Sequence, residues 1–289
     1  MVSTSSALHI KGQGFQEGYW RIAASQPGAL RWQTVGRLGL VAGRAYEATT
    51  GGDEVVLALL DGAVTLEANG RSESVSRSGA DFADGPTYLC LPPATPYQLT
   101  AQTPTADLLV VQALAPTHAD AQGGAVRPAD APVRRVGAAN WARDVWPGTS
   151  LSPYTQRLLV GETLNPPGGW SSYPPHKHDE VAPPTEAIYE EVYFFQFKPA
   201  GGFGFQRIYT RAANTNQSGD ALDEAFVVQD GDTIIIPRGY HPVVAAPGYQ
   251  MRYVWSLCGE PSGAKRYGAW SDDPDHVWVR AVEAMLAAR

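Results

Sequence analysis

Two histidines one residue apart, His176 and His178, have the residue type and spacing that could bind a metal ion. Side chains of an extended segment alternate between two faces, so both imidazoles would point one way and Lys177 the other. Glu191 opens a run of aromatic and β-branched residues, and alternation gives its carboxylate the same inward face as Tyr193. This spacing predicts two imidazole nitrogens and a carboxylate that converge on one interior.

A further histidine follows a second β-like run. Three isoleucines precede a tight turn at Arg238 and Gly239, and His241 stands where the next strand would begin. Imidazoles combined with a carboxylate suit Zn, Mn, Fe, Ni or Co and leave coordination positions open for water or substrate. A His-x-His pair alone occurs often by chance, but four such residues at strand ends favour a metal site. The predicted ligands are His176, His178, Glu191 and His241.

The neighbouring charged residues and the other histidines are not predicted to be ligands of this metal site. Alternation turns Glu190 away from Glu191, which predicts a solvent-facing carboxylate. Lys177 points away from the metal and is expected in a salt bridge or at the rim. His276 is interpreted as a surface or interdomain residue, and no role is assigned to His9 or His118.

The elements that must position these residues are short β-strands. Apolar and β-branched runs separated by turn residues fill two halves of the sequence. The dipeptide Asp61-Gly62 between two apolar runs is a hairpin signal, and Asp230-Gly231 in the second half echoes it. A stretch rich in Ala, Gly, Pro and Asp separates the halves. We therefore predict an all-β chain of two similar barrels in tandem, over residues 1–115 and 133–289, joined by a linker over 116–132.

The C-terminal end has a different pattern. Asp273 is a plausible N-cap, Pro274 suits the first helical position, and apolar residues then recur at helical spacing. This predicts one short C-terminal helix that packs by an apolar stripe. The stripe consists of Trp278, Val279, Val282, Met285 and Leu286.

Composition and charge restrict the partners. The 289 residues include 30 Gly and 23 Pro, which fits many turns between short strands, and the net charge is −7. No cluster of Lys and Arg offers a surface for nucleic acid, and no apolar run is long enough to cross a bilayer. Only two cysteines are present, Cys90 and Cys258, far apart in the sequence. We expect a cytoplasmic protein with reduced thiols that binds neither nucleic acid nor membrane.

Longer stretches around these residues resemble a known family. The pattern Gly-x6-His-x-His, a later Glu, and Gly-x5-Pro-x-Gly-x-His resembles the two cupin motifs. The surrounding sequence, including WSSYPPHKHD and PRGYHPVVAAPGY, is similar to the bacterial 5-deoxyglucuronate isomerases of inositol catabolism. The resemblance covers residues 133–280 strongly and the first half more loosely. Trp255 and Cys258 depart from the family pattern, which favours Asn and a small residue there.

The resemblance implies a bicupin fold, with a divalent metal, Zn first among the candidates, in the C-terminal barrel. It also implies interconversion of 5-deoxy-D-glucuronate and 5-dehydro-2-deoxy-D-gluconate. The family's ligands fall on the four residues reached from spacing. The first half has no histidine in its corresponding motif, where Tyr97 stands instead, so its barrel is expected to bind no metal.

An aldose–ketose isomerase needs a base, for which three interpretations stay open. The base is a hydroxide held by the metal, a carboxylate released from it such as Glu191, or the phenol of Tyr193. Tyr193 has an alternative interpretation as an aromatic core residue. The substrate carboxylate calls for a basic side chain at the cavity mouth, and Arg207 and Arg238 are the predicted partners.

Two other functions fit the same ligands. Three histidines and a glutamate on a cupin also suit iron or copper dioxygenases, which consume oxygen. A non-catalytic sugar-binding cupin is the third interpretation, although such a protein has no need of an open metal position. By analogy with other bicupins, we expect a homo-oligomer.

Overall fold

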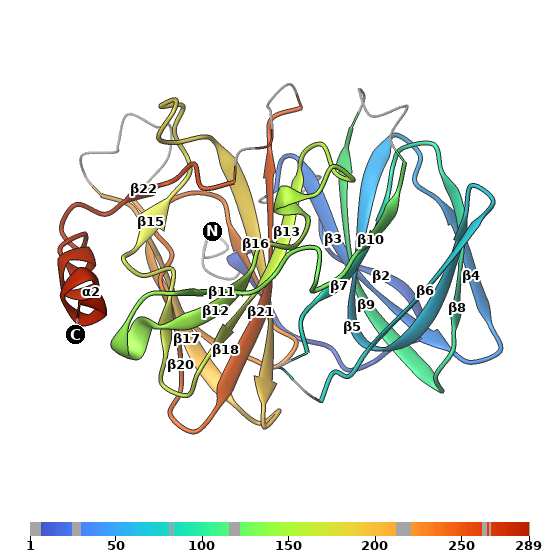
Figure 1. The fold of residues 1–289 in the computed structure, drawn as a ribbon, viewed down its shortest axis with the longest axis horizontal. Helices are drawn as coiled ribbons and strands as arrows, with labels where there is room; N and C mark the ends of the chain where they lie inside the picture. The colour runs from blue at the N-terminus through green and yellow to red at the C-terminus, as the bar shows by residue number, and fades with distance from the viewer. Residues whose placement is uncertain are drawn as a thin grey trace.

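Strands provide nearly all of the regular structure and form two β-sandwiches that lie side by side (Figure 1). The computed structural model describes residues 7–24, 30–80, 82, 84–115, 122–211, 221–261, 265 and 267–288. The short helix α2, Val279–Ala287, lies at the end of the second sandwich that is remote from the first. The predicted all-β class is confirmed, with its one short C-terminal helix.

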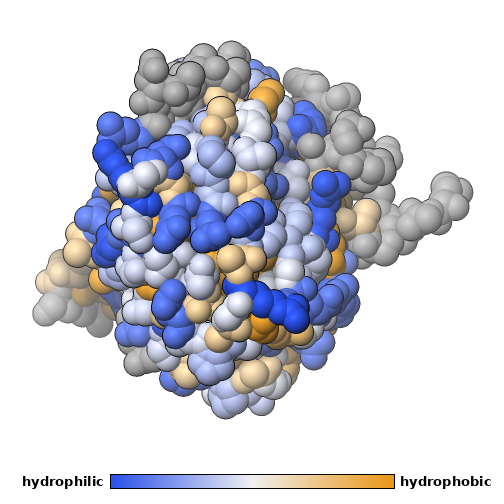
Figure 2. All heavy atoms as spheres, turned by 90° about the vertical axis from the view of Figure 1, so that its right-hand side faces the viewer, coloured by the Kyte–Doolittle hydropathy of each residue, from blue (hydrophilic) through white to orange (hydrophobic). Residues whose placement is uncertain are grey.

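The N-terminal sandwich has one sheet in the order β10-β7-β5-β9-β3-β2, and a second in which β8 pairs with β4 and β5, and β6 pairs with β5. Its strands are β2 Gly18–Ala23, β3 Gln33–Val41, β4 Ala45–Thr49, β5 Asp53–Ala68, β6 Arg71–Arg77, β7 Thr87–Leu91, β8 Pro96–Ala101, β9 Thr105–Leu114 and β10 Gly124–Val126. A core rich in Leu and Val fills the space between the sheets. Seen from the side of β4, β6 and β8, the surface is mostly hydrophilic with scattered hydrophobic residues (Figure 2).

The long strand β5 corrects one prediction. Asp61-Gly62 forms no hairpin but lies inside β5, where the register with β9 shifts between Leu59 and Asp61. Gly62 has a φ of 92°, and a Cβ built on it would lie 2.6 Å from the carbonyl oxygen of Thr105. Glycine therefore permits a bulge here, and the bulge lets one strand run from the first sheet into the second.

The C-terminal sandwich carries the predicted ligands. Its larger sheet has the order β1-β19-β16-β21-β13-β12-β11, and its smaller sheet the order β14-β20-β17-β18. The strands of these sheets are β1 His9–Ile10, β11 Arg134–Val136, β12 Arg143–Trp146, β13 Leu158–Asn165, β14 Trp170–Ser171, β16 Tyr189–Lys198, β17 Phe203–Tyr209, β18 Asp223–Gln229, β19 Thr233–Ile236, β20 Val243–Ala245 and β21 Gln250–Gly259. A separate ribbon pairs β15 His176–Lys177 with β22 Ser271–Asp272. Two short 3₁₀ helices, Ala139–Trp141 and Gly148–Leu151, flank β12.

Two segments cross the predicted domain boundaries. Strand β1 pairs antiparallel with β19 of the second sandwich, and His9 Nε2 lies 2.9 Å from Asp232 Oδ2. Strand β10, inside the predicted linker, pairs with β7 of the first sandwich. The linker prediction is therefore wrong for residues 124–126, whereas 116–121 lie outside the described residues. Neither segment has the apolar pattern of a strand. Both form strands because their backbone groups are paired at the edge of a sheet.

Two glutamates join the sandwiches in a reciprocal way. Glu54 of β5 accepts hydrogen bonds from three backbone N–H groups at the start of β13, those of residues 156–158, at 2.6–2.8 Å. Glu190 of β16 accepts hydrogen bonds from residues 31–33 at the start of β3, at 2.5–2.8 Å. Burial raises the pKa of Glu190, and the three donors oppose that rise. Each sandwich thus provides one carboxylate that accepts backbone N–H groups at the start of a strand of the other sandwich.

This arrangement corrects the prediction for Glu190. Alternation does turn its side chain away from Glu191, but that face of the sheet is covered by the first sandwich, so Glu190 is only 1% exposed. Because Glu54 and Glu190 occupy corresponding positions, Val55 corresponds to Glu191. Among the described residues, the one cluster of metal-binding types lies in the second sandwich. That the first barrel binds no metal stays a prediction.

The C-terminal helix also differs from its prediction. Asp273 heads the turns that precede α2 and accepts the N–H of Asp275 at 3.0 Å, but the regular helix starts only at Val279. Within the predicted stripe only Val279 is buried, while Trp278 and Met285 are 61% and 65% exposed. The packing prediction is therefore wrong for most of the stripe, because periodicity locates an apolar face without showing what covers it. No helix in the described ranges combines the length and apolar character that crossing a bilayer requires.

Replacing either joining glutamate should destabilise the protein. Glu54→Ala and Glu190→Ala each leave three backbone donors without their acceptor, which should lower the free energy of unfolding by about 3 kcal/mol or more. Denaturant unfolding followed by tryptophan fluorescence measures this change. Glu67→Ala, on the exposed face of β5, is the matched control. Equal stability of Glu67→Ala and Glu54→Ala would contradict the joining role.

Candidate metal centre

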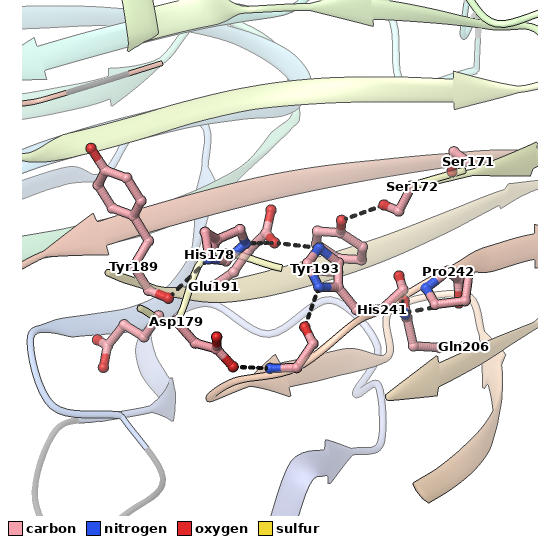
Figure 3. A network of polar contacts seen from close by, with 12 residues as sticks. Ser171, Ser172, His178, Asp179, Tyr189, Glu191, Tyr193, Gln206, His241 and Pro242 are labelled. Atoms are coloured by element: carbon pink, nitrogen blue, oxygen red, sulfur yellow. Dashed lines mark hydrogen bonds and ion pairs between the residues drawn. The ribbon is translucent and has the colours of Figure 1, made fainter. Parts of the chain in front are cut away.

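Three of the predicted ligands come together in the interior of the second sandwich. Each of His178, Glu191 and His241 offers one ligand atom, and these atoms lie within 4.8 Å of one another. All three residues are buried. His178 directly follows β15, Glu191 is the third residue of β16, and His241 lies in the turn between β19 and β20. Dashed lines in Figure 3 join Glu191 to both imidazoles.

Backbone carbonyls fix the tautomer of both imidazoles. Nδ1 of His178 lies 3.0 Å from the carbonyl oxygen of Tyr189, and Nδ1 of His241 lies 2.9 Å from that of Gly239. Carbonyl oxygens only accept hydrogen bonds, so each Nδ1 carries a proton and donates. In the neutral rings Nε2 is then the atom with the free lone pair, which is the state that binds a metal.

Both free lone pairs face the same carboxylate oxygen. Nε2 of His178 lies 3.0 Å from Oε2 of Glu191, and Nε2 of His241 lies 3.2 Å from it. The Nε2 atom of His241 is buried and makes no hydrogen bond in this arrangement. Lone pairs facing a carboxylate oxygen repel it unless a cation lies among them. The donor set therefore fits a divalent ion bound by two imidazoles and a carboxylate.

The charges of the cluster agree with this interpretation. Burial favours the neutral form of Glu191, but His178 and His241 outweigh it and lower the pKa of its carboxyl to about 2. Burial opposes the charged form of His178 as well, yet its contact with Glu191 raises the pKa of this histidine. The carboxylate is thus ionised, and a proton takes the place on His178 that a metal would take.

The fourth predicted ligand lies beside the other three. The ring centroid of His176 is 4.7 Å from that of His241, and its ring also lies against Trp270 at 5.3 Å. Burial, followed by the charges of His241 and His178, keeps the pKa of His176 well below its ordinary value. His176 is therefore neutral at pH 7 and has a lone pair available at the cavity wall.

A buried charge network, not predicted from the sequence, links two ligand segments. Lys177 Nζ lies 2.8 Å from both Asp179 Oδ1 and Glu186 Oε1, so the salt bridge expected for Lys177 is present. Asp179 Oδ2 accepts the N–H of Gly239 at 2.8 Å, and the carbonyl of Gly239 accepts Nδ1–H of His241. The residue that follows His178 thus positions the turn that carries His241 (Figure 3). The signal in the sequence was the run of charges after His178.

A cavity of about 410 Å³ opens beside the cluster, a volume that suits a small sugar acid. Its lining includes His176, His178, Glu191 and Tyr193. The Tyr193 hydroxyl lies 2.9 Å from Ser172 Oγ. Burial, and then the charge of Glu191, raise the pKa of Tyr193 well above its ordinary value. The phenol facing the cavity is therefore protonated at neutral pH.

The two predicted carboxylate partners do not line this cavity. Arg207 lies on the exposed face of β17 and pairs with Asp223 at 2.7 Å, because Gln206 and Ile208 are the residues that point inward. Arg238 lies in the turn before His241 but is also absent from the lining. The cavity instead contains Arg134, Arg135, Arg143 and Arg280. The strand that carries Arg143 was not predicted, so its alternation could not be used.

The structure accommodates both residues that depart from the family pattern, Trp255 and Cys258. Trp255 lines the cavity and stacks on Tyr267, with 6.1 Å between centroids. Gly161 lies opposite Trp255 in the ladder, and a Cβ there would come within 2.2 Å of the indole ring. Cys258 points to the other face and is fully buried. A glycine across the sheet therefore makes room for the tryptophan.

The two sandwiches have the cupin fold that the sequence predicts. A solved structure with another function shares this fold. It is the formate complex of oxalate decarboxylase from Lactobacillus farciminis, with a TM-score of 0.63 at 12% identity, over 98% of this chain and 91% of that one. The chain belongs to the KduI/IolB family, whose model matches residues 8–279. The IolB-like protein of Salmonella typhimurium LT2 is similar at a TM-score of 0.82 and 25% identity, over 94% of this chain and 99% of the other.

Curated relatives define the class of enzyme. The 5-deoxy-glucuronate isomerases of Geobacillus kaustophilus (strain HTA426) and Geobacillus thermodenitrificans (strain NG80-2) are each 34% identical over 267 residues. The matches cover 91% of this chain and 91% and 92% of the two relatives. The chain is an enzyme of the isomerase class, and its predicted resemblance to this family is confirmed.

Removing the central carboxylate should abolish metal binding. Glu191→Gln replaces the charge shared by two imidazoles with a neutral amide, so Zn or Mn added to chelator-treated protein should no longer raise the melting temperature. In the unchanged protein the added metal should raise it, less so at acid pH, where a proton competes for Nε2 of His178. Glu260→Gln, at an exposed position, is the control. Full metal content of Glu191→Gln by mass spectrometry would contradict the assignment.

Proposed function

We propose that this isomerase is metal-dependent and converts 5-deoxy-D-glucuronate to 5-dehydro-2-deoxy-D-gluconate in myo-inositol degradation. The observation that carries the proposal is the buried carboxylate oxygen of Glu191 shared by two imidazoles, beside a cavity of sugar-acid size. The names of the relatives supply the substrate. A cytoplasmic location and a homo-oligomeric state complete the proposal, the first supported by two buried free cysteines.

The metal would be held by His178, Glu191 and His241, with His176 as the fourth ligand. Zn is the first candidate, and Mn, Fe, Ni and Co suit the same donors. The oxalate decarboxylase of Bacillus subtilis, which shares the fold at a TM-score of 0.61 and 12% identity, has Mn(II) centres. A divalent cation at this place supplies a Lewis acid for the carbonyl and hydroxyl oxygens of the substrate.

The reaction itself moves two protons and needs no oxidant. Conversion of an aldose to a ketose transfers a proton from C2 to C1 and another from the C2 hydroxyl to the C1 oxygen. Bonds to hydrogen break and form, and the carbon skeleton and the overall oxidation state stay unchanged. Two groups of the chain, one ionised and one protonated, are sufficient for these transfers.

Glu191 is proposed to carry the proton between the carbon atoms. Both imidazoles contact Oε2, so Oε1 remains for the substrate. Its low pKa keeps the carboxylate ionised but makes it a weak base. The C2 proton must therefore be acidified by polarisation of the neighbouring carbonyl before Oε1 removes it.

Tyr193 is proposed to exchange the proton between the oxygen atoms. Because its pKa is well above its ordinary value, the phenol donates rather than accepts at neutral pH. Its bond with Ser172 Oγ holds the hydroxyl in place, and the serine can return a proton. This assigns Tyr193 the role of acid, which separates it from the phenolate base considered from the sequence.

The reaction and its metal dependence are tested together. Purified protein is assayed with 5-deoxyglucuronate as isolated, after chelation, and after Zn or Mn is returned, and the ketone is detected by NMR. Product that disappears on chelation and returns with metal supports the proposal. Fully loaded protein that makes no product would contradict it, and oxygen uptake with a phenolic substrate would then indicate a dioxygenase.

Removing the hydroxyl of Tyr193 should slow the chemical step. Tyr193→Phe is expected to lower kcat by about 100-fold or more while the metal content stays unchanged. Tyr253→Phe is the matched control, because that ring packs 4.4 Å from Tyr193 and its hydroxyl bonds Ser171 in the same way. Steady-state kinetics on both variants distinguish the roles. If Tyr253→Phe alone lost activity, the acid would be Tyr253.

A further inference from the structure

An arginine that no part of the predicted site included lies in the wall of the metal cavity. Arg143 is the first residue of β12, and alternation along this strand points Arg143 and Val145 into the cavity. Trp146 points the other way, into a small cluster with Phe82 and Leu164. We propose that Arg143 binds the carboxylate of the sugar acid, so that the carbonyl end of the substrate reaches the metal centre. This inference rests on the proposed function.

Backbone hydrogen bonds hold the guanidinium of Arg143 in place, but they occupy only some of its donors. Its Nη1 donates to the carbonyl oxygens of Trp141 and Tyr173, at 3.1 and 3.2 Å. Nε and Nη2 make no hydrogen bond to any residue that the structure describes. A guanidinium offers five donors in a planar fork that matches a carboxylate. Two of its three nitrogens thus remain for a ligand.

No described carboxylate lies within ion-pair distance of Arg143, which separates it from the other arginines of the cavity. Arg135 pairs with Asp144 at 2.9 Å and Arg280 with Asp272 at 2.6 Å. Arg134 is exposed to solvent at the rim. Arg143 is therefore the partly enclosed cation of this lining that has no carboxylate at ion-pair distance among the described residues, and Glu283 acts on it only from farther away.

The electrostatics of the cavity indicate what this cation lacks. Burial lowers the pKa of Arg143, although an arginine stays charged in a protein. Its positive charge contributes to the lowered pKa of His176, so it acts on the ligand side of the cavity. A partly desolvated charge without a partner is unfavourable, and an arriving carboxylate would relieve that cost through charge-assisted hydrogen bonds.

The backbone nearby leaves space for the guanidinium. Gly137 has a φ of 79°, and a Cβ built on it would lie 2.9 Å from Nη1 of Arg143 and 2.2 Å from the carbonyl oxygen of Trp141. Any other residue would push against the group that anchors the arginine. The turn between β11 and β12 is thus shaped around the position of this side chain.

The proposal makes Arg143 a specificity-determining residue. Binding of the acid end would favour substrates with a carboxylate at the carbon farthest from the carbonyl. An analogue with a hydroxymethyl group at C6 would leave the guanidinium unpaired and should bind more weakly. A site with this discrimination rejects neutral aldoses of the same length.

The test compares two variants with two ligands. Arg143→Met should raise KM for 5-deoxyglucuronate by about 10- to 100-fold, the value of hydrogen bonds to a charged group, with little change for the C6 hydroxymethyl analogue. Arg143→Lys keeps the positive charge but loses the planar pair of donors, so its KM should lie between those of Arg143→Met and the unchanged protein. Arg207→Met, on the exposed face of β17 and outside the cavity, is the matched control and should have the KM of the unchanged protein. Melting temperature and metal content establish that each variant is folded and loaded.

Binding measured by calorimetry separates this inference from the proposed function. If the unchanged protein bound 5-deoxyglucuronate without converting it, and Arg143→Met lost that binding, the acid site would stand while the isomerase assignment failed. If Arg143→Met bound and converted the acid as the unchanged protein does, the inference would be overturned. The same holds if Arg207→Met lost affinity equally, or if the unchanged protein did not prefer the acid to its neutral analogue.

Discussion

One carboxylate oxygen, Oε2 of Glu191, determines how the rest of this site is organised. It faces two imidazoles whose other nitrogens already donate to backbone carbonyls, so it cannot be satisfied by ordinary hydrogen bonds from neutral rings. A cation suits the place among the three groups, and a proton on His178 takes that place where no metal does. The surrounding structure serves to hold this arrangement, through the carbonyls of Tyr189 and Gly239 and the buried Asp179 that fixes Gly239. The chemistry proposed for the cavity follows from that constraint.

Alternation along β16 connects the site to the architecture. Glu190 points to the joint between the sandwiches and accepts three backbone N–H groups, while Glu191 points to the cavity. Neighbouring residues on one strand thus set the position of the two sandwiches and the metal ligand together. The corresponding strand of the first sandwich keeps the joining residue, Glu54, but has Val55 at the ligand position. The joint is symmetric and the chemistry is not.

The sequence was sufficient for the class of fold and for the core of the site. Alternation and turn chemistry are local properties, so they correctly turned Glu191 inward and brought it near His178 and His241. They could not show what covers the opposite face of a strand, which is why Glu190 was predicted to be exposed. Arg207 was predicted to face the cavity, but it lies on the exposed face of β17. A shift of one residue in the assumed alternation moves every side chain of a strand to the opposite face. The position of Arg143 could not be predicted because it lies on β12, a short strand whose sequence has no apolar pattern.

The pairing of β1 with β19 has a consequence for the order in which the molecule is assembled. His9 contacts Asp232, 223 residues later in the chain. During synthesis β1 must wait, unpaired, until the first sandwich and the strands of the second sandwich up to β19 have emerged. The edge of β19, in the sandwich with the candidate metal centre, is therefore covered by a segment that precedes the first sandwich in the chain. Such a contact has a high loop-closure cost, so closure of this edge is a late event in folding.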